Sequence, residues 1–182
     1  MADNLHKLTV QEATNQIAQR KVIRVIPTIE TSEYVSGDVI FNSVAIPNAV
    51  IGKGGCSKLI AAYMVSNSTD NLLFEMIFTE NSATFGTVNA TANISDADIR
   101  TAKVLASWAC EAVDDTTEHL DNSEIKRIFD TRSANGNTVP SVEPTLLQAA
   151  ENSTDVYFAV LGGSTITYAG ANDLEFIFHI EY

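Results

Sequence analysis

The stretch Leu174–Glu181, which reads LEFIFHIE, decides the fold class. Its large apolar residues recur at every second position, and they are Leu174, Phe176, Phe178 and Ile180. Two glutamates and a histidine stand among the residues between them. A period of two is the pattern of a β-strand that buries one face, so this stretch predicts a half-buried strand.

Similar patterns occur through most of the chain. Leu72–Thr79 alternates in the same way and predicts a second strand of a packed sheet. Shorter runs rich in β-branched or alternating apolar residues predict further strands over 22–29, 39–41, 57–65 and 124–131. Pro27 places the first of these at a sheet edge or near a strand end.

Glycine pairs predict where strands turn. Gly162-Gly163 separates Val156–Leu161 from Ser164–Tyr168, which predicts a hairpin and, with the final strand, a three-strand meander. Asn135-Gly136 is the strongest short hairpin signal in the chain. The residues from 111 to 121 carry five acids without a Lys or Arg, and we expect an exposed loop there.

Two helices are predicted. Thr9 to Glu12 fits a capping box, and the apolar spacing that follows predicts a short helix over 10–20. Ser95 is a good N-cap, with acids in the next turn, for a helix that runs to about Ser107. Its expected core-facing stripe consists of Ile99, Ala102, Leu105 and Ala106.

The pattern as a whole predicts a mainly β protein. It favours an antiparallel β-sandwich of jelly-roll type with one or two short helices. We divide the chain into an N-terminal arm with a short helix over residues 1–29 and a β-sandwich domain over 30–182.

Composition limits the class of protein. The 182 residues are 45% hydrophobic and 19% charged, which is typical of a globular domain. The longest uncharged run, Val156–Asn172, is interrupted by Gly, Ser and Thr, so no transmembrane helix is expected. The net charge of −12 disfavours nucleic acid and anionic lipid as partners. Residues 1–24 carry +2, so the rest carries −14.

Cysteine and signal patterns predict synthesis in the cytosol. Residues 1–21 have no apolar core of a secretory signal. Cys56 and Cys110 are the only cysteines, and the default in a reducing compartment is two free thiols. We expect Trp108 and Cys110 to be buried in the core.

No catalytic, metal or cofactor motif emerges. His6, His119 and His179 are dispersed, and the two-histidine strand motif of a metal-binding jelly roll is absent. The acids Asp114, Asp115, Glu118 and Asp121 lack the spacing of a calcium loop, so a solvated loop is the favoured interpretation. A small jelly-roll enzyme stays an alternative only if acids of the 111–121 loop converge in the fold.

One family resemblance is visible. Tyr34-Val35-Ser36-Gly37-Asp38-Val39-Ile40 resembles the Y-x-x-G-D-x-[IV] opening of small β-sandwich virion proteins of tailed bacteriophages. Later stretches follow the same layout in order, and they are 72–78, 95–98, 165–168 and 173–176. The match covers about residues 30–181. The resemblance implies a non-catalytic capsid decoration (cement) protein on the outer shell.

The resemblance also implies partners. They are the major capsid protein and further copies of the chain, as a dimer or trimer, on the capsid exterior after synthesis in the host bacterial cytoplasm. The N-terminal segment is the candidate docking element, through Leu5, Leu8, Ile17, Arg20, Lys21 and Arg24. Without residues 1–24, we expect the sandwich to fold and shell binding to be lost.

The alternative function is a tail, fibre or head-fibre component that binds a host surface glycan. It predicts aromatic residues on an exposed loop rim, with Tyr34, Phe85 and Tyr168 as candidates.

Overall fold

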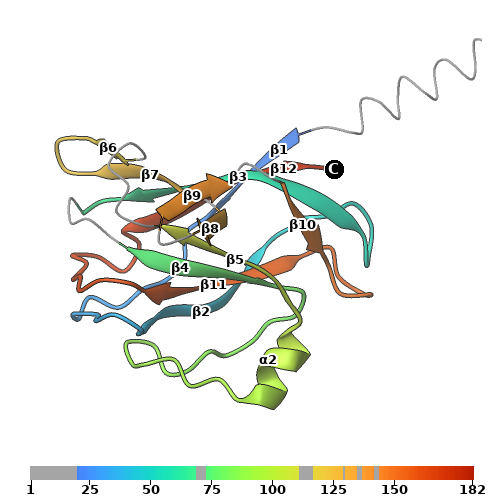
Figure 1. Cartoon of the computed structure of the whole chain (residues 1–182), viewed down its shortest axis with the longest axis horizontal. Helices are drawn as coiled ribbons and strands as arrows, with labels where there is room; N and C mark the ends of the chain where they lie inside the picture. Colours follow the sequence, from blue (N-terminus) through green and yellow to red (C-terminus); the bar gives the residue numbers. More distant parts are fainter. Residues whose placement is uncertain (1–19, 69–72, 111–116, 129, 135–136, 142–143) are drawn as a thin grey trace, which may run out of the picture.

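The computed structural model describes residues 20–68, 73–110, 117–128, 130–134, 137–141 and 144–182 (Figure 1). Within these residues the chain forms one helix, α2 (Asp96–Ala102), and twelve strands. The strands are β1 (Arg20–Val25), β2 (Val39–Ile46), β3 (Cys56–Ser66), β4 (Phe74–Thr79), β5 (Val104–Cys110), β6 (Thr117–His119), β7 (Glu124–Ile128), β8 (Asp130–Ala134), β9 (Asn137–Ser141), β10 (Thr145–Gln148), β11 (Val156–Gly162) and β12 (Leu174–Glu181). The predicted mainly β class is confirmed.

Two antiparallel sheets pack against each other. One has the strand order β1-β12-β3-β7-β6, with β10 also paired to β3, and the other has the order β2-β11-β4-β5. The strands β1 to β4 alternate between the two sheets. Strand β12 then lies between β1 and β3 in one sheet, and β11 lies between β2 and β4 in the other. This strand order is that of a jelly roll, so the predicted antiparallel sandwich is confirmed.

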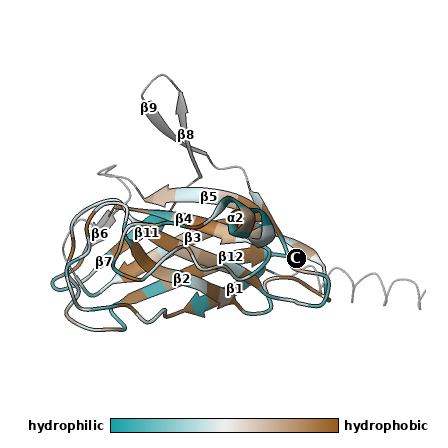
Figure 2. Ribbon diagram, turned by 90° about the horizontal axis from the view of Figure 1, so that it is seen from below, coloured by the Kyte–Doolittle hydropathy of each residue, from teal (hydrophilic) through white to brown (hydrophobic). Residues whose placement is uncertain are grey.

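Aromatic rings fill the space between the sheets. Phe158 of β11 lies 5.2 Å from Phe176 and 4.9 Å from Phe178, both on β12 of the other sheet, with steep interplanar angles. Phe41 of β2 joins the same cluster, 5.3 Å from Phe158. Edge-to-face contacts of this kind add to the hydrophobic gain of burial. Hydrophobic residues are concentrated in the strands of both sheets in Figure 2. The sequence pattern correctly predicted this face of β12 as core.

The outer face of the β2-β11-β4-β5 sheet is covered. Phe85 and Ala159 form a second buried cluster with Val39, and Ile99 of α2 and Leu161 of β11 pack against it. In Figure 1, α2 lies beside this sheet and far from β1 and β12. The segment between β4 and β5 therefore covers the outer side of this sheet.

The same segment also protects the β2 edge of that sheet. The Phe85 amide donates to Asn42 Oδ1 (2.6 Å), and the Asn89 amide donates to the Val39 carbonyl (2.9 Å). Covered edges cannot pair with foreign strands. Strand β1, by contrast, has only β12 as a sheet neighbour within the described part of the chain.

The residues of the Y-x-x-G-D motif build the turn that enters β2. The Glu30 amide donates to Tyr34 Oη (2.7 Å), and the Val35 amide donates to Asp38 Oδ2 (2.9 Å). Gly37 has a φ of 91°, which a residue with a side chain rarely adopts. These hydrogen bonds and the conformation of Gly37 give the motif a structural role in the turn.

The predicted second helix is too long. It begins after Ser95 as predicted, but it ends at Ala102 because Lys103 takes a left-handed conformation with φ 54°. Leu105 and Ala106 belong to β5, which pairs along its length with β4. The gain from adding a strand to the sheet overrides the helical spacing of these residues.

The predicted C-terminal meander is wrong. Strand β11 already has β2 and β4 as neighbours, so Ser164–Tyr168 cannot pair with it. Instead, Ile166 forms an isolated bridge with Tyr34. Gly163 is needed for close approach, since a Cβ there would lie 3.1 Å from the Leu73 carbonyl. The glycine pair leads the chain away from one sheet and toward the other.

Two loop predictions have mixed outcomes. Thr117–His119, within the expected 111–121 loop, forms β6 and pairs with β7, whereas residues 111–116 lie outside the described residues. The strands β8 and β9 flank Asn135-Gly136 and are paired with Ala134 opposite Asn137, as a hairpin predicts. The pair itself lies outside the described residues.

The described part of the expected N-terminal arm, residues 20–29, is joined to the sandwich. Ile23, Val25 and Ile29 are buried in the main core. The Ile29 amide also donates to the Ala171 carbonyl (3.0 Å). The predicted helix over 10–20 lies outside the described residues, apart from Arg20, the first residue of β1.

Candidate docking surface

Three of the six candidate docking residues lie on β1, and they are Arg20, Lys21 and Arg24. The other three, Leu5, Leu8 and Ile17, lie outside the described residues. Strand β1 is antiparallel to β12, with Arg20 opposite Glu181 and Arg24 opposite Ile177. The structure therefore places the three cations at an edge of the sandwich.

The two faces of β1 have different roles. Ile23 and Val25 point into the core, whereas Val22 is 52% exposed on the outer side. Arg20 and Arg24 lie on the same side of β1 as Val22, and their side chains are 74% and 59% exposed. Period-two alternation thus divides this short strand into an anchoring side and a solvent side.

Ion pairs link β1 to its neighbours. Arg20 Nε lies 3.3 Å from Glu181 Oε2, and Arg24 Nη1 lies 3.0 Å from Glu175 Oε1. Lys58 of β3 approaches the other oxygen of Glu181, with Nζ 3.5 Å from Oε1. Exposed pairs of this kind contribute about 0–1 kcal/mol to stability, so they orient the cations more than they stabilise the fold.

The surface extends beyond β1, and we call it the β1 face. It consists of Arg20, Val22, Arg24 and Ile26 in and just after β1, Glu175, Ile177, His179 and Glu181 of β12, and Lys58 and Tyr63 of β3. The Tyr63 and His179 rings lie 5.3 Å apart at its centre. Sequence analysis missed Lys58 and Tyr63 as surface neighbours of Arg20 and Arg24, because only the pairing of β1 with β12 and of β12 with β3 brings them together.

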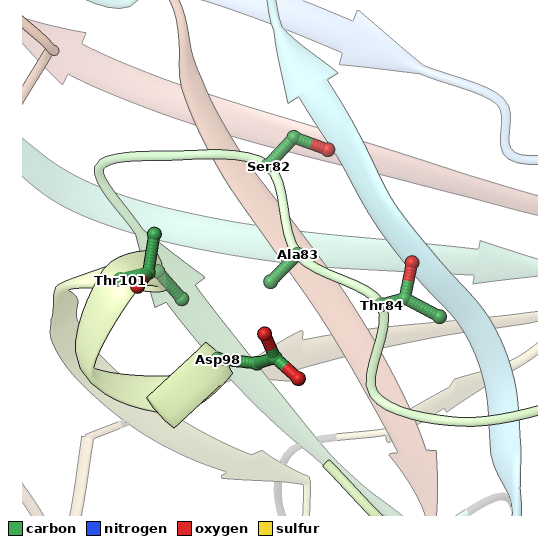
Figure 3. A pocket seen from close by; sticks show the side chains of 6 residues that line it. Ser82, Ala83, Thr84, Asp98 and Thr101 are labelled. Atoms are coloured by element: carbon green, nitrogen blue, oxygen red, sulfur yellow. The ribbon is translucent and has the colours of Figure 1, made fainter. Parts of the chain in front are cut away.

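A hollow lies between α2 and the segment after β4 (Figure 3). It measures about 260 Å³ and is lined by Ser82, Ala83, Thr84, Asp98, Thr101 and Ala102. Its one carboxylate, Asp98, accepts a 2.6 Å hydrogen bond from Ser95 Oγ as part of the helix cap. The hollow is smaller than most ligand sites, and its polar lining consists of three hydroxyl groups and the Asp98 carboxylate.

Buried polar groups lie at the β7 end of the core. Glu124 and Lys126 both point inward from β7 and are fully buried, with Lys126 Nζ 3.7 Å from Glu124 Oε1. Burial raises the pKa of Tyr168, and nearby Tyr34 and Glu124 raise it further. Buried ion pairs of this type seldom add net stability, but removing one partner is costly.

The described residues contain no group of three or more His, Cys, Asp or Glu side chains that could hold a metal ion. Asp114 and Asp115 of the acidic run lie outside the described residues. Cys110 is buried and Cys56 is exposed, and neither forms a disulfide. Trp108 is buried as predicted, and its indole N–H donates to Thr145 Oγ1 (2.9 Å).

The aromatic rim that a glycan-binding function requires is not formed by the predicted residues. Tyr34, Phe85 and Tyr168 are 0%, 1% and 1% exposed. The Tyr34 hydroxyl accepts a hydrogen bond from the Glu30 amide in the turn into β2. The Phe85 amide donates to Asn42 Oδ1 at the β2 edge. Their apolar character thus serves packing, and this prediction is wrong.

Comparison of the sequence with protein-family models gives no match, and comparison with curated proteins gives none either. In the described part of the chain, no helix has the length and apolar character needed to cross a membrane.

Proposed function

We propose that the protein is a phage virion structural protein of the capsid decoration (cement) type, which binds the outer surface of the shell and stabilises it. The observation that carries the proposal is the group of exposed cations Arg20, Lys21 and Arg24 on β1, an edge strand among the described residues of this jelly roll, in a chain with net charge −12. Jelly rolls are common in viral capsid and lectin domains.

The proposed action needs no pocket. A shell offers many equivalent sites, so weak contacts by each copy add up when copies also bind one another. The partners are the major capsid protein and further copies of this chain, as a dimer or trimer. The acidic body keeps unassembled copies in solution in the host cytoplasm before they reach the capsid exterior.

The copy number in virus particles tests this proposal. Quantitative mass spectrometry of purified particles compares this chain with the major capsid protein. We expect hundreds of copies in a simple ratio to the shell protein. A handful of copies would instead indicate a tail, vertex or fibre component, and absence from the particles would contradict the virion assignment.

A further inference from the structure

The two outer faces of the sandwich differ in how they are covered. The β2-β11-β4-β5 sheet has Phe85, Ile99 and their neighbours packed on its outer side. Within the described residues no comparable cluster covers the outer side of the β1-β12-β3 sheet. The β1 face is the bare side of the described sandwich.

Exposed apolar side chains lie at separate places on this bare side. Val22 and Ile26 are 52% and 58% exposed, and Leu146 of β10, opposite Lys58, is 58% exposed. These three are among the seven large hydrophobic residues that the described chain exposes. Val22 and Ile26 alternate with Arg20 and Arg24 along one side of the chain, and apolar side chains set among charges are typical of an interaction surface.

The charge of the β1 face is opposite to that of the molecule. Its three cations, Arg20, Arg24 and Lys58, outnumber Glu175 and Glu181, whereas the whole chain carries −12. Arg20 reaches its glutamate through Nε alone, and Arg24 through one Nη nitrogen. A guanidinium has five N–H donors, so both arginines keep donors for a further carboxylate.

A second copy of β1 is a poor partner for this edge. Arg20, Lys21 and Arg24 place three cations within five residues, and like charges across a strand pair are destabilising. Cationic edge residues are a known device against pairing between identical edges. Nucleic acid is disfavoured as well, because the acidic body repels a polyanion outside the short reach of these side chains.

We infer that the β1 face is the surface that docks on an acidic protein partner, which under the proposed function is the capsid shell. Arg20 and Arg24 lie four residues apart on one side of a strand, a span of about 13 Å with Val22 between them. The partner presents two carboxylates at about that separation, with an apolar group between them. This inference rests on the proposed function and adds the surface and the chemistry of its partner.

Co-sedimentation with shells that lack this protein tests the inference. The variants are Arg20→Glu with Arg24→Glu, which reverses the charge, and Val22→Ser, which leaves the three ion pairs intact. Arg100→Glu is the matched control, because Arg100 is exposed on α2 beside the other sheet. Thermal unfolding of each variant checks the fold.

We expect the double variant to lose at least about ten-fold in shell affinity and Val22→Ser to lose a few-fold, with Arg100→Glu unchanged. Binding of the wild-type chain should weaken as salt rises from about 50 to about 300 mM. If the double variant does not fold and Val22→Ser does, the binding of Val22→Ser still decides the outcome.

Other results overturn the inference in distinguishable ways. If the wild-type chain binds shells and the β1-face variants bind equally well, the decoration function stands and the docking surface is elsewhere. If the variants change only the oligomeric state in sedimentation velocity, the face is a contact between copies. If the wild-type chain does not bind shells, the proposed function fails together with the inference.

Discussion

Tyr34 and Tyr168 lie edge to face in the core, with ring centres 6.0 Å apart. Their hydroxyl groups differ in hydrogen bonding. Tyr34 Oη accepts from the Glu30 amide and donates to the Ile40 carbonyl. Tyr168 Oη is buried and has no hydrogen-bond partner among the described residues. A buried hydroxyl without a partner loses its bonds to water and gains none in return.

Tyr168→Phe should therefore raise the free energy of unfolding by about 0.5–1 kcal/mol at pH 7, because it removes that hydroxyl and keeps the ring. Tyr34→Phe is the matched control and should lower it by about 1–2 kcal/mol, since it leaves the Glu30 amide without its acceptor. Urea unfolding measures both. A loss of stability in Tyr168→Phe equal to that of Tyr34→Phe would contradict this account.

The same residue predicts an alkaline limit of stability. Burial raises the pKa of Tyr168 in the folded protein above the value of about 10 expected in the unfolded chain. The folded state thus holds this proton more tightly, so the stability is present below pH about 10 and falls as the pH rises beyond it. Burial also raises the pKa of Tyr34. Tyr168→Phe should consequently reduce the alkaline slope without abolishing it.

At the level of single elements, β1 contributes to the core and, under the proposed function, to docking. Ile23→Ala should lower the free energy of unfolding by about 2–4 kcal/mol, because the side chain is 5% exposed in the core. Val22→Ala, its neighbour on the outer side, should change it by less than about 0.5 kcal/mol. Equal effects would mean that β1 does not divide its residues between core and solvent.

The position of β1 in the sheet complicates a deletion test of the N-terminal arm. Removing residues 1–24 deletes all of β1 except Val25, and with it Ile23 from the core. Loss of binding after that deletion would combine unfolding with loss of contacts. Substitutions on the outer side of β1 separate the two effects.

The elements show what sequence patterns can predict. Strands β3, β4 and β12 followed from period-two alternation because each buries one face. The end of α2 and the neighbours of β11 did not follow, because both depend on which distant strand is available for pairing. Local spacing cannot show that Val104–Cys110 gains more from joining β4 than from extending a helix.

The proposed docking surface also has a part that local sequence predicts and a part that it does not. Arg20, Lys21 and Arg24 were predicted from their local excess of positive charge in an acidic chain. Their association with Glu175, Glu181 and Lys58 was not, because these residues lie on strands far away in the sequence. Charge along a chain is a local property, whereas a surface is made by the topology.

For the molecule as a whole, the net charge of −12 predicts that the folded state becomes more stable as salt is added. Docking through the β1 face should instead weaken with salt. Repulsion among the acids destabilises the compact state, and the screening length falls from about 30 Å at 0.01 M salt to about 10 Å at 0.1 M. Adding sodium chloride at pH 7 should therefore raise the midpoint of thermal unfolding, measured by circular dichroism.

Docking should respond in the opposite direction, because salt screens the attraction between Arg20 or Arg24 and carboxylates of the partner. Near the isoelectric point of about 4.5 the net charge vanishes, so the same salt series should leave the unfolding midpoint nearly unchanged there. A midpoint that falls with salt at pH 7 would show that attractive pairs such as Arg24–Glu175 outweigh the repulsion. The acidic body would then be stabilised by its few cations, and charge reversal at Arg24 would disturb folding as well as docking.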